Sequence, residues 1–213
     1  MNIQPLNINF FNNQKSFSPR ISFGETPLYN IKLKERLEND TFSKTDGTFA
    51  SLNPDDKNDA ELIKKLETLW NPSGYAAVIA EEFLHPHKSK NSSFYIIEKN
   101  SPDNDTLHKT TCIASATNVD NTDKSAFEID YIQTSPDISQ SDKPQIKGSG
   151  ELMVYGCVKE AQKYGFQKVS IFSSNNSFYE HLGFNKVAYR WYELPSSQYD
   201  EFLERVEKKY AME

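Results

Sequence analysis

Two glycines flank a serine in the stretch QIKGSGELM, which runs from Gln145 to Met153. A helical pattern begins directly after it, and the free backbone N–H groups and dipole at the start of a helix attract anions such as phosphate. A P-loop needs a lysine after its last glycine, where this chain has Glu151, and a dinucleotide-binding loop needs a third glycine where it has Met153. The pattern that remains, Gln145-x-x-Gly148-x-Gly150, indicates an anion site and leaves its ligand open.

A second feature lies downstream, where SFYEHLGF (177–184) follows a predicted strand and places Tyr179 on a short helix. The glycine pattern and F-Y-E-x-L-G-F, in this order and at this separation, resemble the GCN5-related N-acetyltransferase superfamily over about residues 92–194. The resemblance implies a sheet whose central strands splay apart into a V-shaped slot that holds acetyl-coenzyme A (acetyl-CoA).

The resemblance also implies which residues contact acetyl-CoA. The backbone amides from Lys147 to Glu151 would hold the pyrophosphate, and the backbone from Ile132 to Thr134 would pair with the pantetheine arm. Gln145 occupies a position where the family has Gln or Arg, and Asn175 or Asn176 stands for a coenzyme-contacting asparagine. The full expected set is Ile132, Gln133, Thr134, Gln145, Ile146, Lys147, Gly148, Ser149, Gly150, Glu151, Asn175, Asn176 and Tyr179.

Acetyl transfer to an amine needs a base, a stabilised carbonyl oxygen and a proton for the leaving thiolate. Glu128 and Asp130 lie two residues apart on one face of a predicted strand, and Glu128 also matches a glutamate base of the histone-acetylating branch of the family. The residues leave open whether Glu128, Asp130 or water alone takes the proton. We expect Tyr179 to be the acid, because a phenol with a pKa of about 10 keeps its proton at neutral pH. A backbone N–H near Thr134 would hold the oxygen.

We therefore expect an acetyl-CoA-dependent N-acetyltransferase that acts on a primary amine, of a small molecule or of a protein, by direct attack in a ternary complex. The alternative is a catalytically silent module of the same fold that binds CoA or another protein. In the family, the acceptor site is built by the region that corresponds to the helix pair 53–84 and the loop 137–144. The residue types there do not identify the amine, and the loop 136–145 is longer than is usual in the family.

An α+β fold must position these residues. Periodicity predicts helices at 53–70, 74–84, from the glycine loop to about residue 164, at 176–184 and at 197–211, and strands at 27–37, 92–100, 110–119, 125–135, 168–174 and 187–194. Three successive strands joined by short loops imply antiparallel pairing, so we expect a mixed, mostly antiparallel central sheet with splayed strands and flanking helices. We expect residues 25–213 to form one domain, and residues 1–24, which lack any period, to form a flexible N-terminal arm.

Composition excludes some classes of function. The net charge of −6 argues against a nucleic-acid binder, and no apolar run approaches the ~18 residues of a membrane span. The start of the chain lacks a secretory signal pattern, so we expect a cytoplasmic location and no membrane partner. Cys112 and Cys157 are interpreted as small buried apolar residues, and His85 and His87 lack the further ligands of a metal site. The oligomeric state, monomer or homodimer, is not specified.

Overall fold

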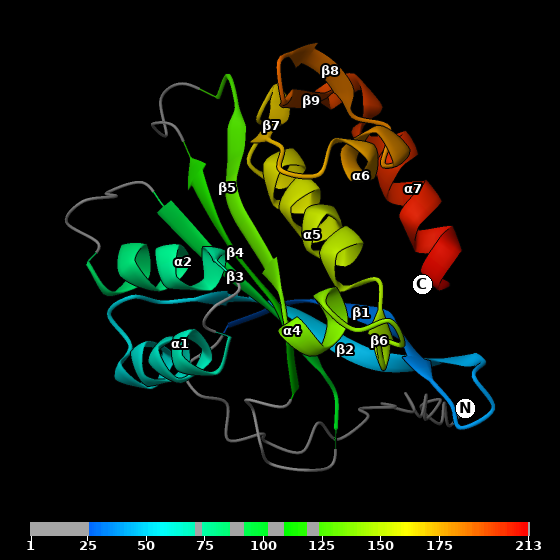
Figure 1. The fold of residues 1–213 in the computed structure, drawn as a ribbon. Helices are drawn as coiled ribbons and strands as arrows, with labels where there is room; N and C mark the ends of the chain where they lie inside the picture. Colours follow the sequence, from blue (N-terminus) through cyan, green and yellow to red (C-terminus); the bar gives the residue numbers. More distant parts are fainter. Residues whose placement is uncertain (1–25, 71–73, 86–91, 102–108, 119–123, 213) are drawn as a thin grey trace, which may run out of the picture.

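The computed structural model of the chain describes residues 26–70, 74–85, 92–101, 109–118 and 124–212. The predicted arm 1–24 lies outside these residues. Within them, a nine-stranded sheet has the order β6-β1-β2-β3-β4-β5-β7-β9-β8 (Figure 1). The strands are β1 (Thr26–Arg36), β2 (Phe42–Leu52), β3 (Ser92–Lys99), β4 (Thr110–Asn118), β5 (Phe127–Thr134), β6 (Ile146–Lys147), β7 (Lys168–Phe172), β8 (Asn185–Ala188) and β9 (Trp191–Pro195).

All neighbouring strands of this sheet are antiparallel except β5 and β7, which are parallel. The expectation of a mixed, mostly antiparallel sheet with flanking helices is confirmed. The sheet is strongly twisted, so that β1 and β2 cross β5 at a large angle in Figure 1, as the right-handed twist of strands accumulates across a large sheet.

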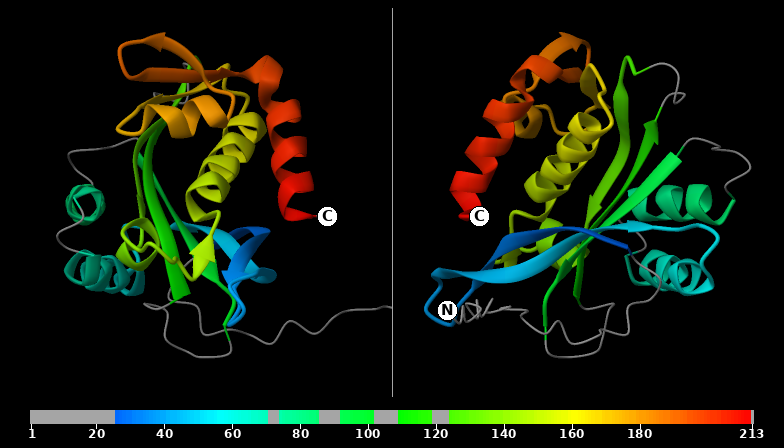
Figure 2. Two further views of the ribbon diagram at one scale, coloured as in Figure 1. Left: turned by 45° about the vertical axis from the view of Figure 1, so that its right-hand side comes forward. Right: turned by 180° about the vertical axis from the view of Figure 1, so that it is seen from behind.

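Helices cover both faces of the sheet. They are α1 (Lys57–Trp70), α2 (Tyr75–Leu84), α4 (Pro136–Ser139), α5 (Ser149–Lys163), α6 (Asn176–His181) and α7 (Tyr199–Tyr210), with a 3₁₀ turn η2 (Ser196–Gln198) before α7. The pair α1 and α2 lies on one face, and α5 with α7 lies on the other (Figures 1 and 2). Each face buries its own hydrophobic core, because side chains of β3 alternate between the two cores.

Helix α5 crosses the second face and carries the glycine loop at its start. Its apolar stripe, formed by Met153, Val154, Cys157, Val158 and Ala161, is fully buried. After the helix, Gly165 has a φ of +76°, a left-handed conformation that ends helices and favours glycine. Cys112 is buried as well, so both cysteines are the small core residues that the sequence predicts.

The sequence interpretation was wrong at several elements. It missed β2, which pairs along the whole of β1, and the strand predicted at 187–194 is a hairpin of β8 and β9 that turns at Arg190, whose φ is +61°. The predicted loop 137–144 begins inside the short helix α4. The helix predicted at 197–211 begins two residues later, because the η2 turn precedes α7, and the N-cap residue Gln198 makes no side-chain cap hydrogen bond.

Candidate active site

The sheet opens between β5 and β7. Phe127–Ile129 pairs with Val169–Ile171, and in the described part of the chain β5 then continues to Thr134 with no further pairing to β7. On its other edge β5 stays paired with β4, with a register shift at Asp130 that makes it the extra residue of a β-bulge. Because a bulge bends a strand and increases its twist, the two parallel strands separate, as Figures 1 and 2 show. The splayed strands expected for the fold are present.

A cavity of about 260 Å³ lies at this opening. Glu128 and Asp130 of β5 line it together with Tyr179 of α6, so the fold brings the three predicted catalytic residues to one cavity. The full lining is Tyr75, Glu128, Ile129, Asp130, Tyr131, Ile132, Ile171, Phe172, Ser174, Tyr179 and Trp191. Carboxylates, a phenol and aromatic rings therefore meet where the pairing of β5 with β7 ends.

Asp130 is the carboxylate with a perturbed proton affinity. The pKa of Asp130 is raised from 3.8 to about 6, mainly by burial and to a smaller extent by the nearby charges of Glu128 and Glu82. The hydroxyl of Thr117 on β4 donates a hydrogen bond of 2.7 Å to its Oδ2 and opposes this rise. A carboxylate with a pKa near 6 is mostly ionised at neutral pH and binds a proton more readily than an exposed aspartate, which is what a general base requires.

Tyr179 is held by the short helix α6. The side-chain oxygen of Asn175 caps this helix by accepting the N–H of Phe178 at 3.4 Å. The ring of Tyr179 is only 7% exposed and lies 5.9 Å from the ring of Phe184 and 6.2 Å from that of Tyr192. Burial raises the pKa of Tyr179 above its ordinary value of 10. The phenol therefore stays protonated at neutral pH and is suited to donate a proton rather than to accept one.

The glycine loop meets the open end of β5 on one side. A Cβ at Gly150 would stand 3.6 Å from Phe178 of α6 and 3.7 Å from Thr134 of β5, so the loop lies between these two elements. Gly148, the N-cap residue of α5, has a φ of +98°, a conformation that other residues rarely adopt. Ser149 is 1% exposed, and its Oγ has no hydrogen-bond partner among the described residues.

On the other side of the loop, helix α7 covers Gly148. The Tyr210 hydroxyl of α7 would stand 2.5 Å from a Cβ at Gly148, and it donates a hydrogen bond of 2.7 Å to Glu151. Lys209 pairs with the same carboxylate at 2.6 Å. Glu151, which was expected to contribute only a backbone amide, therefore joins the start of α5 to the end of α7. No local pattern signals this contact, because it joins residues that are far apart along the chain.

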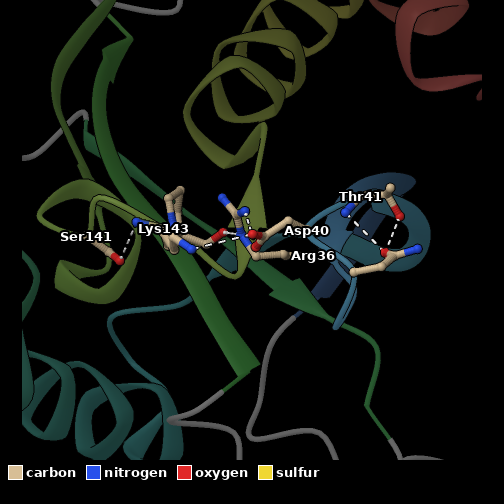
Figure 3. Close-up of polar contacts among 7 residues, drawn as sticks. Arg36, Asp40, Thr41, Ser141 and Lys143 are labelled. Carbon is tan, nitrogen blue, oxygen red and sulfur yellow. Dashed lines mark hydrogen bonds and ion pairs between the residues drawn. The ribbon is translucent and has the colours of Figure 1, made fainter.

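The long loop before the glycines is tied to the N-terminal hairpin (Figure 3). Arg36 at the end of β1 donates from Nε to the carbonyl of Pro144 at 3.1 Å, and its backbone N–H donates to the carbonyl of Gln145 at 2.7 Å. Asp40 in the β1–β2 turn pairs with Arg36 at 3.0 Å and with Lys143 at 3.4 Å. These contacts fix the path of the loop where it enters β6.

The other residues predicted to contact the coenzyme differ in their exposure and in the hydrogen bonds that they already make. The β6 residues Ile146 and Lys147 pair with β1, and the Ile146 side chain is buried in the core. Gln133 is buried and donates from Nε2 to the carbonyl of Thr134 at 2.7 Å. Lys147 and Gln145 are exposed. Ile132 lines the cavity.

The structure distinguishes the two asparagines that are candidates for contacting the coenzyme. The side-chain oxygen of Asn175 is used in the cap of α6, whereas Oδ1 of Asn176 is buried and has no hydrogen-bond partner among the described residues. Asn176 is therefore the asparagine whose side-chain oxygen can still accept a hydrogen bond from a ligand.

Four aromatic residues of the cavity were not singled out from the sequence: Tyr75, Tyr131, Phe172 and Trp191. In the described ranges, no group of three or more His, Cys, Asp or Glu residues has a geometry that could hold a metal ion. His87 and His108 lie outside those ranges. None of the described helices is long and apolar enough to cross a membrane.

The fold has counterparts among solved structures. An acetyltransferase candidate from Exiguobacterium sp. 255-15 aligns with 73% of this chain and 97% of its own at a TM-score of 0.50 and 11% identity. A Tyr-to-Phe variant of the toxin AtaT, bound to the C-terminus of the antitoxin AtaR, aligns with 73% of this chain and 96% of its own at 0.51 and 13% identity. GCN5 of Tetrahymena aligns with 69% and 94% at 0.49 and 12%. No family model and no curated protein matches the sequence.

Proposed function

On the premise that this chain has the GCN5-related N-acetyltransferase fold, we propose that it is an acetyl-CoA-dependent N-acetyltransferase that acts on a primary amine. The observation that carries the proposal is the cavity between the splayed strands, which joins Asp130 and Glu128 on β5 to Tyr179 on α6. Fold likeness alone does not establish an activity. The pairing of an ionisable carboxylate with a protonated phenol in one cavity supports this chemistry.

The residues around the glycine loop fit acetyl-CoA. The N-terminus of α5 offers N–H groups and a dipole that favour a pyrophosphate, and Gly150 keeps the loop close to the end of β5. Two buried polar atoms without partners among the described residues, Ser149 Oγ and Asn176 Oδ1, are suited to bind a polar ligand. The edge of Ile132–Thr134 that faces away from β4, which does not pair with β7, would hold the pantetheine arm. Acetyl-CoA would supply an acetyl group activated as a thioester.

The proposed reaction is direct attack in a ternary complex. An N–C bond forms between the amine and the acetyl carbonyl carbon, the C–S bond breaks, and one proton moves from nitrogen to sulfur overall. Asp130 accepts the proton from the amine, directly or through water, because its raised pKa suits a base. Glu128 lies beside it and holds the amine. Tyr179 donates a proton to the departing sulfur, and an unpaired N–H of β5 near Thr134 stabilises the carbonyl oxygen.

Two measurements test the proposal. Calorimetry measures binding of acetyl-CoA to the full chain, and thiol release measures turnover with a panel of alkyl amines and a lysine peptide. Binding with turnover supports the proposal. Binding without turnover on every amine indicates a silent CoA-binding module, and absence of binding refutes the interpretation of the glycine loop.

The role of Tyr179 is tested with Tyr179→Phe. We expect turnover to fall about 100-fold with little change in acetyl-CoA affinity, in line with the usual size of general acid–base effects. Tyr199→Phe is the matched control, because Tyr199 is also buried and its hydroxyl has no partner among the described residues, but it lies outside the cavity. Equal turnover in the two variants removes Tyr179 from the mechanism.

A further inference from the structure

The β-bulge in β5 brings side chains of two strands together on the α2 face of the sheet. Thr117 of β4 pairs with Glu128. Ser115, two residues earlier on β4, pairs with Tyr131. Paired residues share a face, and so do residues two apart on one strand. Glu128 and Tyr131 therefore lie on one face although they are three residues apart, because Asp130 is inserted as an extra residue. The ring of Tyr131 lies 5.4 Å from a tyrosine ring of α2, which identifies the face.

Thr117 also contacts the carboxyl group of the bulge residue. Its hydroxyl donates a hydrogen bond of 2.7 Å to Oδ2 of Asp130. Asp130 lies two positions past Glu128, the residue that pairs with Thr117, so this contact runs diagonally across the two strands. Because a bulge residue has no partner directly opposite on the neighbouring strand, the hydrogen bond ties the Asp130 side chain to β4.

This hydrogen bond gives the two carboxylate oxygens of Asp130 different surroundings. An ionised aspartate accepts hydrogen bonds through both oxygens, and Oδ2 is held by Thr117. Since Asp130 lines the cavity, Oδ1 is the oxygen that remains for the amine. A hydrogen bond to an ionised acceptor is about twice as strong as one between neutral groups, so it restricts rotation of the carboxylate. A general base must lie within hydrogen-bond reach of the proton that it takes, and this orientation therefore bears on the rate.

We propose that Thr117 is a positioning residue of the site: its hydroxyl fixes Oδ2 of Asp130 against β4, so that Oδ1 faces the cavity and takes the proton of the amine. This inference rests on the proposed function and deepens it, because it explains why Asp130 rather than Glu128 is the base. The proton moves from the amine nitrogen to Oδ1 as the N–C bond forms. Thr117 keeps its own proton and does not touch the substrate.

The groups around Asp130 determine the direction of the test. The titratable side chains near it are Glu128 and Tyr131 of β5, Tyr75 and Glu82 of α2 and Tyr179 of α6. Burial and the two glutamates raise the pKa of Asp130, and the hydrogen bond from Thr117 lowers it. Burial raises the pKa of Tyr131 and of Tyr179 above 10, so both stay protonated at neutral pH. Removing the Thr117 hydroxyl therefore raises the pKa of Asp130.

Thr117→Val removes the hydroxyl and keeps the branched shape of the side chain. Thiol release from the full chain gives kcat/KM from pH 5 to pH 9, and the ratio of variant to wild type cancels the titration of the amine itself. We expect this ratio to be about 0.1 at pH 9, where Asp130 is ionised in both proteins but less well oriented in the variant. It should fall about 10-fold further by pH 5, because loss of a hydrogen bond to a charged group raises the pKa by about one unit.

A direct measurement of the pKa accompanies the kinetics. The ¹³C NMR shift of the Asp130 carboxyl, followed against pH, should give a pKa of about 6 in the wild type and about one unit more in Thr117→Val. An equal pKa in the two proteins overturns the inference, whatever the activity.

Three variants are the controls. Thr117→Ser retains a hydroxyl and should restore a ratio near one at every pH. Ser115→Ala removes a hydroxyl that is buried on the same face of β4 and has no hydrogen-bond partner among the described residues, and it should follow the wild type. Thr117→Ala removes the hydroxyl with a smaller side chain and should repeat the result of the valine. Thermal unfolding and acetyl-CoA calorimetry show that each variant is folded and binds the coenzyme.

The outcomes separate the two levels of the proposal. A ratio for Thr117→Val that does not change with pH, or a serine variant as impaired as the valine variant, overturns the positioning role while acetyl transfer still supports the proposed function. Absence of transfer to every amine, with acetyl-CoA bound to the wild type, overturns both.

Discussion

Replacing Asp130 with asparagine should stabilise the protein at alkaline pH while impairing turnover. Burial raises the pKa of Asp130 from 3.8 to about 6, so the ionised carboxylate is disfavoured in the folded state by about two pKa units. At 1.36 kcal/mol per unit, this corresponds to about 3 kcal/mol. The asparagine of the variant carries no charge, and its side-chain oxygen can still accept the hydrogen bond from Thr117. We expect a gain of about 1–3 kcal/mol at pH 8, since the buried amide retains a desolvation cost of its own.

The sign of the pH dependence follows from linkage. A carboxyl whose folded pKa is raised contributes its stability below the unfolded pKa, here 3.8, and loses it as pH rises through the folded value of about 6. The wild type therefore loses stability relative to Asp130→Asn between pH 3.8 and about 6. The difference should be below about 1 kcal/mol at pH 4 and constant above about pH 7.

Urea denaturation at pH 4, 6 and 8 measures this difference. With a slope of about 1–3 kcal/mol per molar urea, the midpoint at pH 8 should rise by roughly 1 M. Asp142→Asn, in an exposed loop position, is the control for removing one negative charge. A gain that is the same at pH 4 and pH 8, or a variant less stable than wild type at pH 8, would refute the argument that ionisation of Asp130 is costly.

Three glycine substitutions test the packing around α5. In Gly148→Ala the new Cβ lies at φ +98° and 2.5 Å from the Tyr210 hydroxyl, so the free energy of unfolding should fall by about 2–4 kcal/mol. In Gly165→Ala the φ is +76° and no atom lies within 4 Å, so only backbone strain of about 1 kcal/mol should be lost. Equal midpoints in urea for these two variants would mean that Tyr210 moves away freely. Gly156→Ala places its Cβ against the buried ring of Phe49. The free energy of unfolding should fall by about 1–2 kcal/mol, even after the gain in helix propensity. A thermal midpoint at or above that of the wild type would contradict this.

Local pattern predicted the helices well and the sheet incompletely. The stripe on α5 is recognisable because one helix face repeats every 3.6 residues and is buried along its length. β2 has no such signal: residues 43–46 are polar, and its burial comes from Gly47, Phe49, Ala50 and Leu52 near one end. Its pairing with β1 and β3 is non-local, and strand preference depends strongly on such context.

The same distinction applies to the candidate site. Glu128, Asp130 and Tyr179 could be predicted because each sits in a short stretch with its own pattern, and the fold does bring them to one cavity. Tyr75 and Trp191 could not be identified in this way, since each lines the cavity only through the packing of α2 and of β9 beside the splayed strands. The cover that Tyr210 forms over Gly148 depends likewise on the packing of α7 against α5.

The pairing of β6 with β1 has a consequence for the order of folding. It sets Lys147 opposite Lys34, with both helices of the first face and four strands of the sheet in between. Closing so long a loop costs chain entropy before its contacts contribute, and distant pairings form slowly. The glycine loop directly follows β6, so it reaches its final path only when the N-terminal hairpin has docked. In pulse-labelled refolding, the amides of this loop should acquire protection from hydrogen exchange after those of α5 itself.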